Sequence, residues 1–327
     1  MLRCCDLIML CLWCGVDHAV KILVVQSNMQ VIALRFWQAR VRESARRSTS
    51  EIADCALNHT QSFKHEDLVL LPSLYALTLE RGSGTFVEIG AFDGVTGSNT
   101  FMIEKCLGWR GVLIEANPGN YMKARTAGRM SPVVHSAVCD QERGATATIS
   151  VAGEQTSGLI HRLTTYRQLA RKNSTVQVPC QPLKNLLAKH GFGSDAQIDF
   201  LSLDVEGAED IVLRTAVANR FRIVLVETVP GPSVKMTRKI LEGNGLHRAS
   251  NQLYPLSIHA MNDVWLQSST REFPISGMIY HRADLFFASS QKPHVPRDAL
   301  LAALQEADRS TAVGLLPVSP RVVPALS

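Results

Sequence analysis

An acidic, glycine-containing turn, Phe86-Val-Glu-Ile-Gly-Ala-Phe-Asp-Gly94, is the first stretch of the chain whose residue types suit ligand chemistry. Glu88 lies at the end of a short apolar run, and the turn follows it. In a doubly wound α/β sheet, ligands bind beyond the carboxyl ends of the strands, where glycines let the backbone approach the ligand. A dinucleotide site uses a GxGxxG turn that holds a pyrophosphate at a helix start. Here Phe92 replaces the middle glycine and Asp93 adds negative charge, so the turn favours a ligand with a cationic centre.

A second acidic residue, Glu115, ends the next apolar run along the chain. A carboxylate in this position can accept hydrogen bonds from two ribose hydroxyls. S-adenosylmethionine combines a ribose with a positive amino group and a positive sulfonium, and the backbone N–H groups of the turn suit its carboxylate. Together, Glu88 and Glu115 therefore predict this ligand. The alternative is that Glu115 is a surface carboxylate that caps the helix after Pro118.

A third set of acidic residues lies in and after the segment Asp199-Phe-Leu-Ser-Leu-Asp-Val-Glu-Gly-Ala-Glu209. Asp204 ends a predicted strand, Glu206 follows in the turn, and Glu227 ends the next strand. Methyl transfer requires the acceptor and the sulfonium to be held in line, and a hydroxyl acceptor must also lose its proton to a base. We therefore predict these three carboxylates as catalytic residues and expect no metal. There are two alternatives. The same carboxylates could bind a divalent ion, or they could only cap the starts of helices.

The elements that must position these residues begin at Thr85, where short apolar runs start to alternate with helical stretches. This pattern is typical of a parallel sheet wrapped by helices, because parallel pairing needs crossovers and buries both faces of the sheet. The predicted strands are 85–89, 111–115, 132–138, 198–204 and 222–227, with extra strands at 146–151 and 176–179. The predicted helices are 98–107, 119–127, 208–217 and 234–242. A closing antiparallel strand is expected at 262–266 or at 284–287.

Six ordered blocks of the chain make the resemblance to a known family specific. They are the Val-Glu-Ile-Gly-Ala-Phe-Asp-Gly94 turn, Ser-Asn-Thr100 with Glu104-Lys105, Gly-Trp-Arg-Gly-Val-Leu-Ile-Glu115 with Asn117-Pro118, His-Ser-Ala-Val-Cys-Asp140, Val-Pro-Cys-Gln-Pro-Leu183 and the segment 198–209. The stretch from Phe86 to about Val229 resembles the FkbM-type methyltransferases, a branch of the class I S-adenosylmethionine-dependent superfamily.

The resemblance implies a Rossmann-like, mostly parallel seven-stranded sheet with helices on both faces. It also implies S-adenosylmethionine as the methyl donor and O-methylation of a hydroxyl on a sugar, glycan or small natural product. Carried over to this chain, the residues expected around the methionine end of the cofactor are Glu88, Gly90, Ala91, Asp93 and Gly94. Those expected at the ribose are Glu115, Ala116 and Asn117, and those flanking the adenine are Ser136 and Ala137. Asp204 and Glu206 then face the transferred methyl group.

Two parts of the chain have no counterpart in the family. We predict a helical N-terminal extension over 1–80, with helical segments at 20–37 and 67–80, a methyltransferase domain over 81–268, and a partly disordered C-terminal extension over 269–327. Asn99 resembles a variant that also occurs in Star-type trafficking proteins. The alternative function is therefore a binding or trafficking module that keeps the fold without turnover.

Composition sets wider limits on the class of protein. With 46% apolar and 19% charged residues among 327, and only 21 Gly and 14 Pro, the chain is neither disordered nor collagen-like. The net charge of +5 does not argue for a nucleic-acid partner. An arginine cluster between residues 35 and 47 is predicted to be a solvated helix face, with peripheral membrane contact as the alternative.

The cysteines and the N-terminus bear on the compartment. Cys55, Cys106, Cys139 and Cys180 are scattered in apolar surroundings, and we expect buried, reduced thiols. A short apolar run at 7–16 is about half of what a membrane span needs. We expect a cytoplasmic protein, with export or anchoring through this run as the alternative. In that case Asn58 and Asn173 would be glycosylation acceptors.

Overall fold

The computed structural model describes residues 47–141, 145–151, 159, 174–193, 195–216, 220–228, 232–250, 262–276 and 295–314. Several expectations fall outside these residues: the apolar run 7–16, the helical segment 20–37, the arginine cluster up to Arg46, Asn173, and the strand candidate 284–287. No helix in the described ranges is both long enough and apolar enough to cross a membrane.

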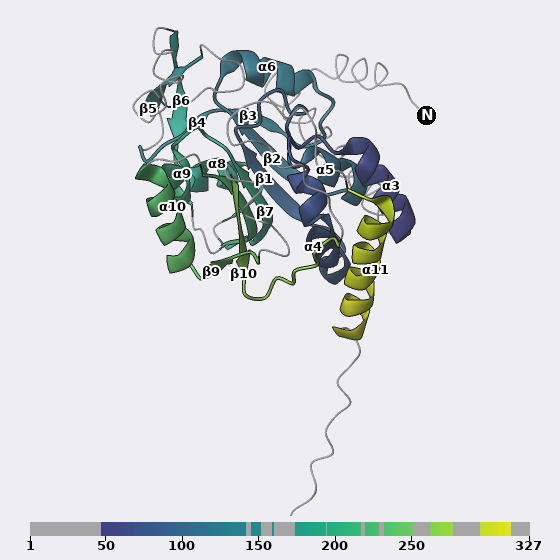
Figure 1. Cartoon of the computed structure of the whole chain (residues 1–327). Helices are drawn as coiled ribbons and strands as arrows, with labels where there is room; N and C mark the ends of the chain where they lie inside the picture. Colours follow the sequence, from purple (N-terminus) through teal and green to yellow (C-terminus); the bar gives the residue numbers. More distant parts are fainter. Residues whose placement is uncertain are drawn as a thin grey trace, which may run out of the picture.

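Within the described residues, seven strands form the central sheet, in the order β3-β2-β1-β7-β8-β10-β9 (Figure 1). The parallel strands are β1 (Thr85–Ile89), β2 (Arg110–Glu115), β3 (Val133–His135), β7 (Ile198–Leu203) and β8 (Phe221–Glu227). The strand β10 (Asn262–Gln267) is antiparallel to β8 and to the short β9 (Leu246–Arg248). The predicted Rossmann-like class is therefore confirmed, and 262–266 is the closing strand.

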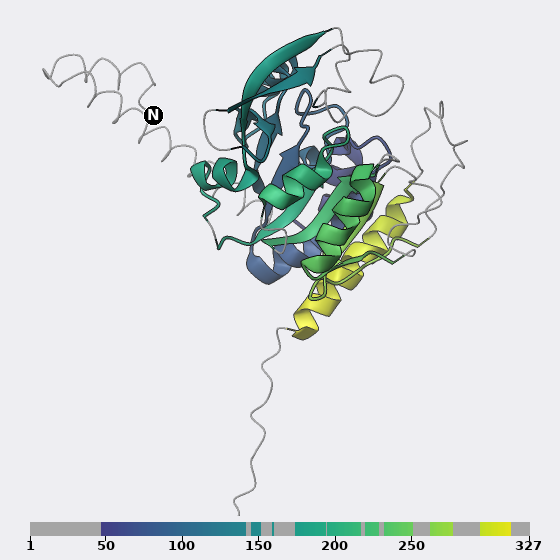
Figure 2. The same cartoon turned by 90° about the vertical axis from the view of Figure 1, so that its left-hand side faces the viewer.

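Helices cover both faces of this sheet (Figures 1 and 2). Successive strand residues point to opposite faces, so Phe86 joins one apolar core and Val87 the other. The helices of the first core are α3 (Thr49–His59), α4 (Glu66–Arg81), α5 (Phe101–Leu107) and α11 (Arg297–Gly314). Those of the second are α8 (Leu183–Lys189), α9 (Glu209–Thr215) and α10 (Pro232–Gly243), while α6 (Pro118–Thr126) contacts β2 and β3.

The prediction of one strand over 132–138 is wrong. The chain changes sheets at Ser136, whose N–H still donates to the Glu115 carbonyl of the central sheet. The next residues form β4 (Ala137–Val138), which pairs with β6 (Thr175–Gln181) in a separate sheet with β5 (Ala145–Ser150). Figure 2 shows this second sheet at one end of the central sheet. The short strands on either side of Ser136 come from one continuous apolar stretch of sequence. Hydrophobicity alone therefore does not show where the chain leaves the central sheet.

The helices outside the family-like region share a core with the sheet. Leu71 and Leu74 of α4 pack in the same cluster as Leu304 of α11, although no helix was predicted at 297–314. An ion pair between Arg297 and Asp54 also joins α11 to α3, with its two nitrogen–oxygen contacts at 2.5 and 2.9 Å. These helices therefore cover the sheet face on which α5 lies.

The expectation of reduced thiols is wrong for the cysteines in the described part of the chain. Cys55 forms a disulfide with Cys106, and Cys139 forms one with Cys180. The partners are 51 and 41 residues apart in sequence, while their Cα atoms are 5.8 Å apart in both pairs. Pairing across such separations depends on how the helices and strands pack, so spacing along the chain did not indicate it.

Candidate functional site

A cavity lies at the carboxyl ends of β1, β2 and β7, between the central sheet and the smaller second sheet. Its position agrees with the rule that ligands of α/β sheets bind beyond the carboxyl ends of the strands. The residues that line it are Ile89, Gly90, Phe92, Ile114, Glu115, Ala116, Asn120, Ser136, Ala137, Val138, Ile149, Leu159, Asp204, Val205, Glu206, Ala208 and Val212.

Gly90 lets β1 and β7 approach each other at the floor of the cavity. Its φ is +84°, and a Cβ at this position would lie 1.8 Å from the backbone carbonyl oxygen of Asp204. The Gly90 N–H donates to the Ile114 carbonyl oxygen at 3.0 Å, and the Asp204 N–H donates to the Ile89 carbonyl oxygen at 3.0 Å. A glycine is therefore required here both by the backbone conformation and by the close approach.

We expect Gly90→Ala to lower the free energy of unfolding by about 3 kcal/mol, because a left-handed conformation and a steric overlap both oppose the new methyl group. Gly191→Ala is the matched control, since Gly191 has a φ of +83° and nothing within 4 Å of a Cβ. It should lose only about 1 kcal/mol from the backbone conformation alone. Urea denaturation of both variants measures the difference, and equal losses would contradict the close approach.

Glu115 presents a buried carboxyl group to the cavity. The residue is 5% exposed. The Phe92 N–H donates to its Oε2 at 2.8 Å, and the Asn117 N–H donates to its Oε1 at 2.7 Å. Burial raises the pKa of Glu115 to about 7, although these N–H groups act in the opposite direction. The helix α6 is capped instead by Asn117, whose Oδ1 accepts the Gly119 N–H. The alternative that Glu115 is a surface cap is therefore wrong.

Three carboxyl groups meet beside the cavity where β7 and β8 end. One oxygen from each of Asp204, Glu206 and Glu227 lies within 4.8 Å of the others. Asp204 and Glu206 line the cavity, and Glu206 holds a left-handed φ of +57°. Three other carboxyl groups stand close to Glu227, so burial and the negative charge of these neighbours raise its pKa well above the ordinary value.

Asp204 and Glu227 form a pair of interacting carboxyl groups. Asp204 is an exposed residue, yet the protein atoms packed around its carboxyl group raise its pKa, whereas the hydrogen bond with Glu227 lowers it. The same bond raises the pKa of Glu227. Glu227 therefore holds a proton more readily than Asp204, which is the member of the pair that lines the cavity. Glu209, whose Oε1 accepts the Gly207 N–H at 2.9 Å, supports the turn into α9.

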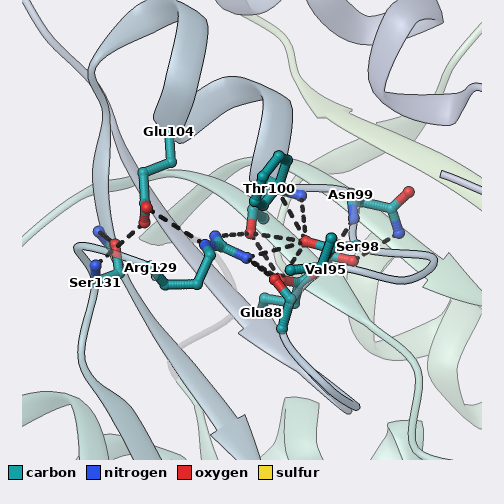
Figure 3. A network of polar contacts seen from close by, with 12 residues as sticks. Glu88, Val95, Ser98, Asn99, Thr100, Glu104, Arg129 and Ser131 are labelled. Carbon is teal, nitrogen blue, oxygen red and sulfur yellow. Dashed lines mark hydrogen bonds and ion pairs between the residues drawn. The ribbon is translucent and has the colours of Figure 1, made fainter. Parts of the chain in front are cut away.

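Glu88 does not line the cavity. Its carboxylate accepts hydrogen bonds from the Ser98 hydroxyl, the Asn99 N–H and the Thr100 hydroxyl, at 2.7 to 2.9 Å. Arg129 lies between Glu88 and Glu104, with nitrogen–oxygen distances of 3.7 and 3.4 Å (Figure 3). The Arg129 side chain is only 1% exposed. This buried network ties the end of β1 to the loop before α5.

The other predicted residues that lie outside the cavity lining also organise the turn. The Asp93 carboxylate accepts the backbone N–H groups of Val95 and Thr96, at 2.9 and 2.7 Å. Gly94 leaves room for Ala124 of α6, whose nearest atoms would lie 3.4 Å from a Cβ. The Gly94 carbonyl oxygen accepts a hydrogen bond from Arg129 at 2.6 Å. Ala91 is buried, and its N–H donates to the Ile114 carbonyl oxygen.

The structure thus brings seven of the thirteen predicted site residues to the cavity wall. They are Gly90, Glu115, Ala116, Ser136, Ala137, Asp204 and Glu206. Glu227 lies behind Asp204, while Asn117 contributes its N–H to Glu115. Sequence reasoning missed Ile149 and Leu159, which come from the insertion and carry no local signal. Phe92 was noticed only as a missing glycine, but it lines the cavity and its φ is +49°.

Comparisons with known proteins bear on the whole region. Residues 88–246 match the family model described as the Methyltransferase FkbM domain. No curated protein matches the chain. Among solved structures, the methyltransferase FkbM from Methylobacillus flagellatus KT is 15% identical with a TM-score of 0.32, over 59% of this chain and 47% of its own. The O-methyltransferase from Bacillus cereus, in complex with SAH, is also 15% identical with a TM-score of 0.32, over 67% and 89%.

A third solved structure, the cofactor-bound Rv0187 from MTB, is 14% identical with a TM-score of 0.33, over 72% of this chain and 88% of its own. All three TM-scores are below 0.5. The family match carries the assignment, because it spans the glycine turn, Glu115 and all three carboxyl groups at the ends of β7 and β8. Residues 88–246 of this chain are a methyltransferase domain of the FkbM family.

Proposed function

We propose that this methyltransferase domain uses S-adenosylmethionine to methylate a hydroxyl group on a sugar, a glycan or a small natural product. The observation that carries the proposal is the Asp204–Glu227 pair, which places a hydrogen-bonded carboxyl group with a raised pKa at the cavity. A methyltransferase that acts on a hydroxyl needs such a base, because the oxygen must lose its proton as the methyl group is transferred.

The cavity fits the chemistry of this cofactor. Three carboxyl groups face it, from Glu115, Asp204 and Glu206, and no described lining residue is a lysine, arginine or histidine. This charge favours a ligand with a sulfonium and an ammonium group. Apolar side chains of Ile149 and Leu159 form a wall that suits an adenine ring. The Glu115 carboxyl group accepts backbone N–H groups, among them those of Phe92 and Asn117, and its remaining acceptor capacity suits a ribose hydroxyl.

The proposed roles follow from these positions. S-adenosylmethionine supplies a methyl group on a positively charged sulfur. Glu115 binds the ribose, and Ser136 and Ala137 flank the adenine. Asp204 accepts the proton of the acceptor hydroxyl, since the surrounding protein atoms raise its pKa above the ordinary value and make it a stronger base. Glu227 donates a hydrogen bond to Asp204 and orients it, and Glu206 positions the acceptor at the same edge of the cavity.

Calorimetry with S-adenosylmethionine and with its demethylated product tests the cofactor. We expect both to bind the full-length protein and to raise its midpoint of thermal unfolding, since a ligand that binds only the folded state stabilises it. Absence of both heat and thermal shift would contradict the proposal. Incubation with methyl-labelled cofactor and native-cell extract then identifies the acceptor. Binding without any labelled product would favour the non-catalytic module instead.

The raised pKa of Glu115 predicts how cofactor affinity depends on pH. Below pH 7 the carboxyl group gains a proton and loses its negative charge and part of its acceptor capacity. We therefore expect the dissociation constant to be about tenfold higher at pH 6 than at pH 8. Glu115→Gln removes the titration, so the variant should bind weakly at both values. The pKa of Asp204 is also raised, so a weak pH dependence of the dissociation constant that remains in Glu115→Gln is assigned to other groups. If the pH dependence in this variant equals that of the wild type, the prediction is wrong.

A further inference from the structure

The two disulfides account for every cysteine in the described residues, and they lie in different parts of the fold. Cys55 belongs to α3 and Cys106 to α5, so the first disulfide joins the N-terminal extension to the methyltransferase domain. Cys139 follows β4 and Cys180 lies in β6, so the second closes the base of the smaller sheet. Structural disulfides persist in oxidising compartments and are rare where glutathione keeps thiols reduced.

The surroundings of the first pair favour its oxidation. An Arg47 nitrogen lies 3.5 Å from the Cys55 sulfur and donates to the carbonyl oxygens of Lys105 and Cys106. His59 Nδ1 lies 3.7 Å from the same sulfur. A cationic group beside a cysteine favours the thiolate, which is the form that attacks a disulfide in an exchange reaction.

The second pair supports one wall of the cavity. The segment between Cys139 and Cys180 contains β5, and Ile149 of β5 lines the cavity together with Leu159. The backbone is paired at the base of this segment, where the Cys139 N–H donates to the Gln181 carbonyl oxygen at 3.3 Å. A covalent link at this base restricts the conformational freedom of the segment that carries the wall.

We propose that this methyltransferase matures in an oxidising compartment, where both cysteine pairs become structural disulfides and the second one fixes the cofactor-binding wall. Each pair loses two protons and two electrons as its sulfur–sulfur bond forms. The electrons reduce one disulfide of an exchange partner, either a protein disulfide or glutathione disulfide, to two thiols. The expected compartment is thus the exported one, rather than the cytoplasm.

Disulfide mapping of the full-length protein from its native cells tests the proposal without reference to its catalytic function. The cells are quenched with acid and alkylated with N-ethylmaleimide under denaturing conditions, and the peptides are analysed by mass spectrometry without reduction. We expect linked peptides for Cys55–Cys106 and Cys139–Cys180. Recovery of these four cysteines as N-ethylmaleimide adducts would show free thiols and would overturn the proposal. So would zinc bound by Cys55, His59 and Cys106, whose ligand atoms lie within 4.8 Å of one another.

Paired variants separate the two disulfides by function. The double variant Cys139→Ser/Cys180→Ser should bind S-adenosylhomocysteine about tenfold more weakly, because binding must then order the freed wall. The matched control Cys55→Ser/Cys106→Ser should keep its affinity and lower only the thermal midpoint. Equal affinities in the two variants would overturn the role of the second disulfide. If the wild-type protein does not bind S-adenosylhomocysteine, the proposed cofactor is wrong. The disulfide mapping still tests the proposed disulfides in that case.

Discussion

Replacing Asp204 with asparagine is expected to lower turnover by about a hundred- to ten-thousandfold, which is the usual contribution of a positioned general base. The amide keeps the shape of the side chain but cannot accept the hydroxyl proton. Cofactor affinity should fall much less than turnover, because Glu115 and Glu206 still present carboxyl groups to the cavity. Transfer of labelled methyl to the acceptor measures turnover, and calorimetry measures affinity.

Two further measurements identify the role of the carboxyl pair. Glu227→Gln retains a hydrogen-bond donor toward Asp204, so it should lose much less activity and should shift the acidic limb of the pH–rate profile. A chelator added to the wild-type enzyme should leave the rate unchanged if the carboxyl groups act as a base rather than as metal ligands. Asp298→Asn is a control for a general effect of charge, since its side chain is 99% exposed. Full activity in Asp204→Asn would assign this residue a structural role.

Arg129→Leu is expected to reduce the free energy of unfolding by about 3–5 kcal/mol, because it leaves the buried carboxyl groups of Glu88 and Glu104 without their cation. Arg129 also donates to the Gly94 carbonyl oxygen and to the Thr100 hydroxyl, at 2.6 and 2.8 Å. Its loss therefore also loosens the turn that ends at Gly94. Urea denaturation monitored by circular dichroism measures the change in stability.

Arg125→Leu provides the matched control for this substitution. Arg125 lies on the exposed side of α6, and its guanidinium lies 5.6 Å from the Tyr121 ring centroid. Removal of an exposed arginine usually changes stability by less than about 0.5 kcal/mol. A loss below about 1 kcal/mol in Arg129→Leu would mean that the buried carboxyl groups are neutralised without the arginine.

The strand pattern of the central sheet was readable from the sequence because of its burial. In β1, β2, β7 and β8 nearly every residue is buried, and such strands appear as continuous apolar runs between helical stretches. The rule that ligands bind at the carboxyl ends of these strands then located Gly90, Glu115 and Asp204. Shorter elements gave weaker signals: β9 has three residues, and the break at Ser136 interrupts no apolar pattern.

The different roles of the acidic residues could not be predicted from the sequence in this way. Glu88 and Glu115 both lie at or near the end of a strand within an apolar run, yet one joins a buried network with Arg129 and the other lines the cavity. The partner that decides this is Arg129, which lies 41 positions after Glu88 and has no motif around it. Asp93 likewise turns toward its own loop because two backbone N–H groups lie within reach.

By itself, the sequence determined the class of fold, the edge of the sheet that carries the site, and the kind of residue that stands there. These properties depend on local hydrophobic periodicity and on glycines, which act over a few neighbouring residues. Only the tertiary structure decided that Glu227 lies beside Asp204 and has a raised pKa, that Ile149 and Leu159 complete the wall, and that four distant cysteines pair. Such features arise from desolvation, charge proximity and packing between segments that are far apart in the chain, so only the folded arrangement specifies them.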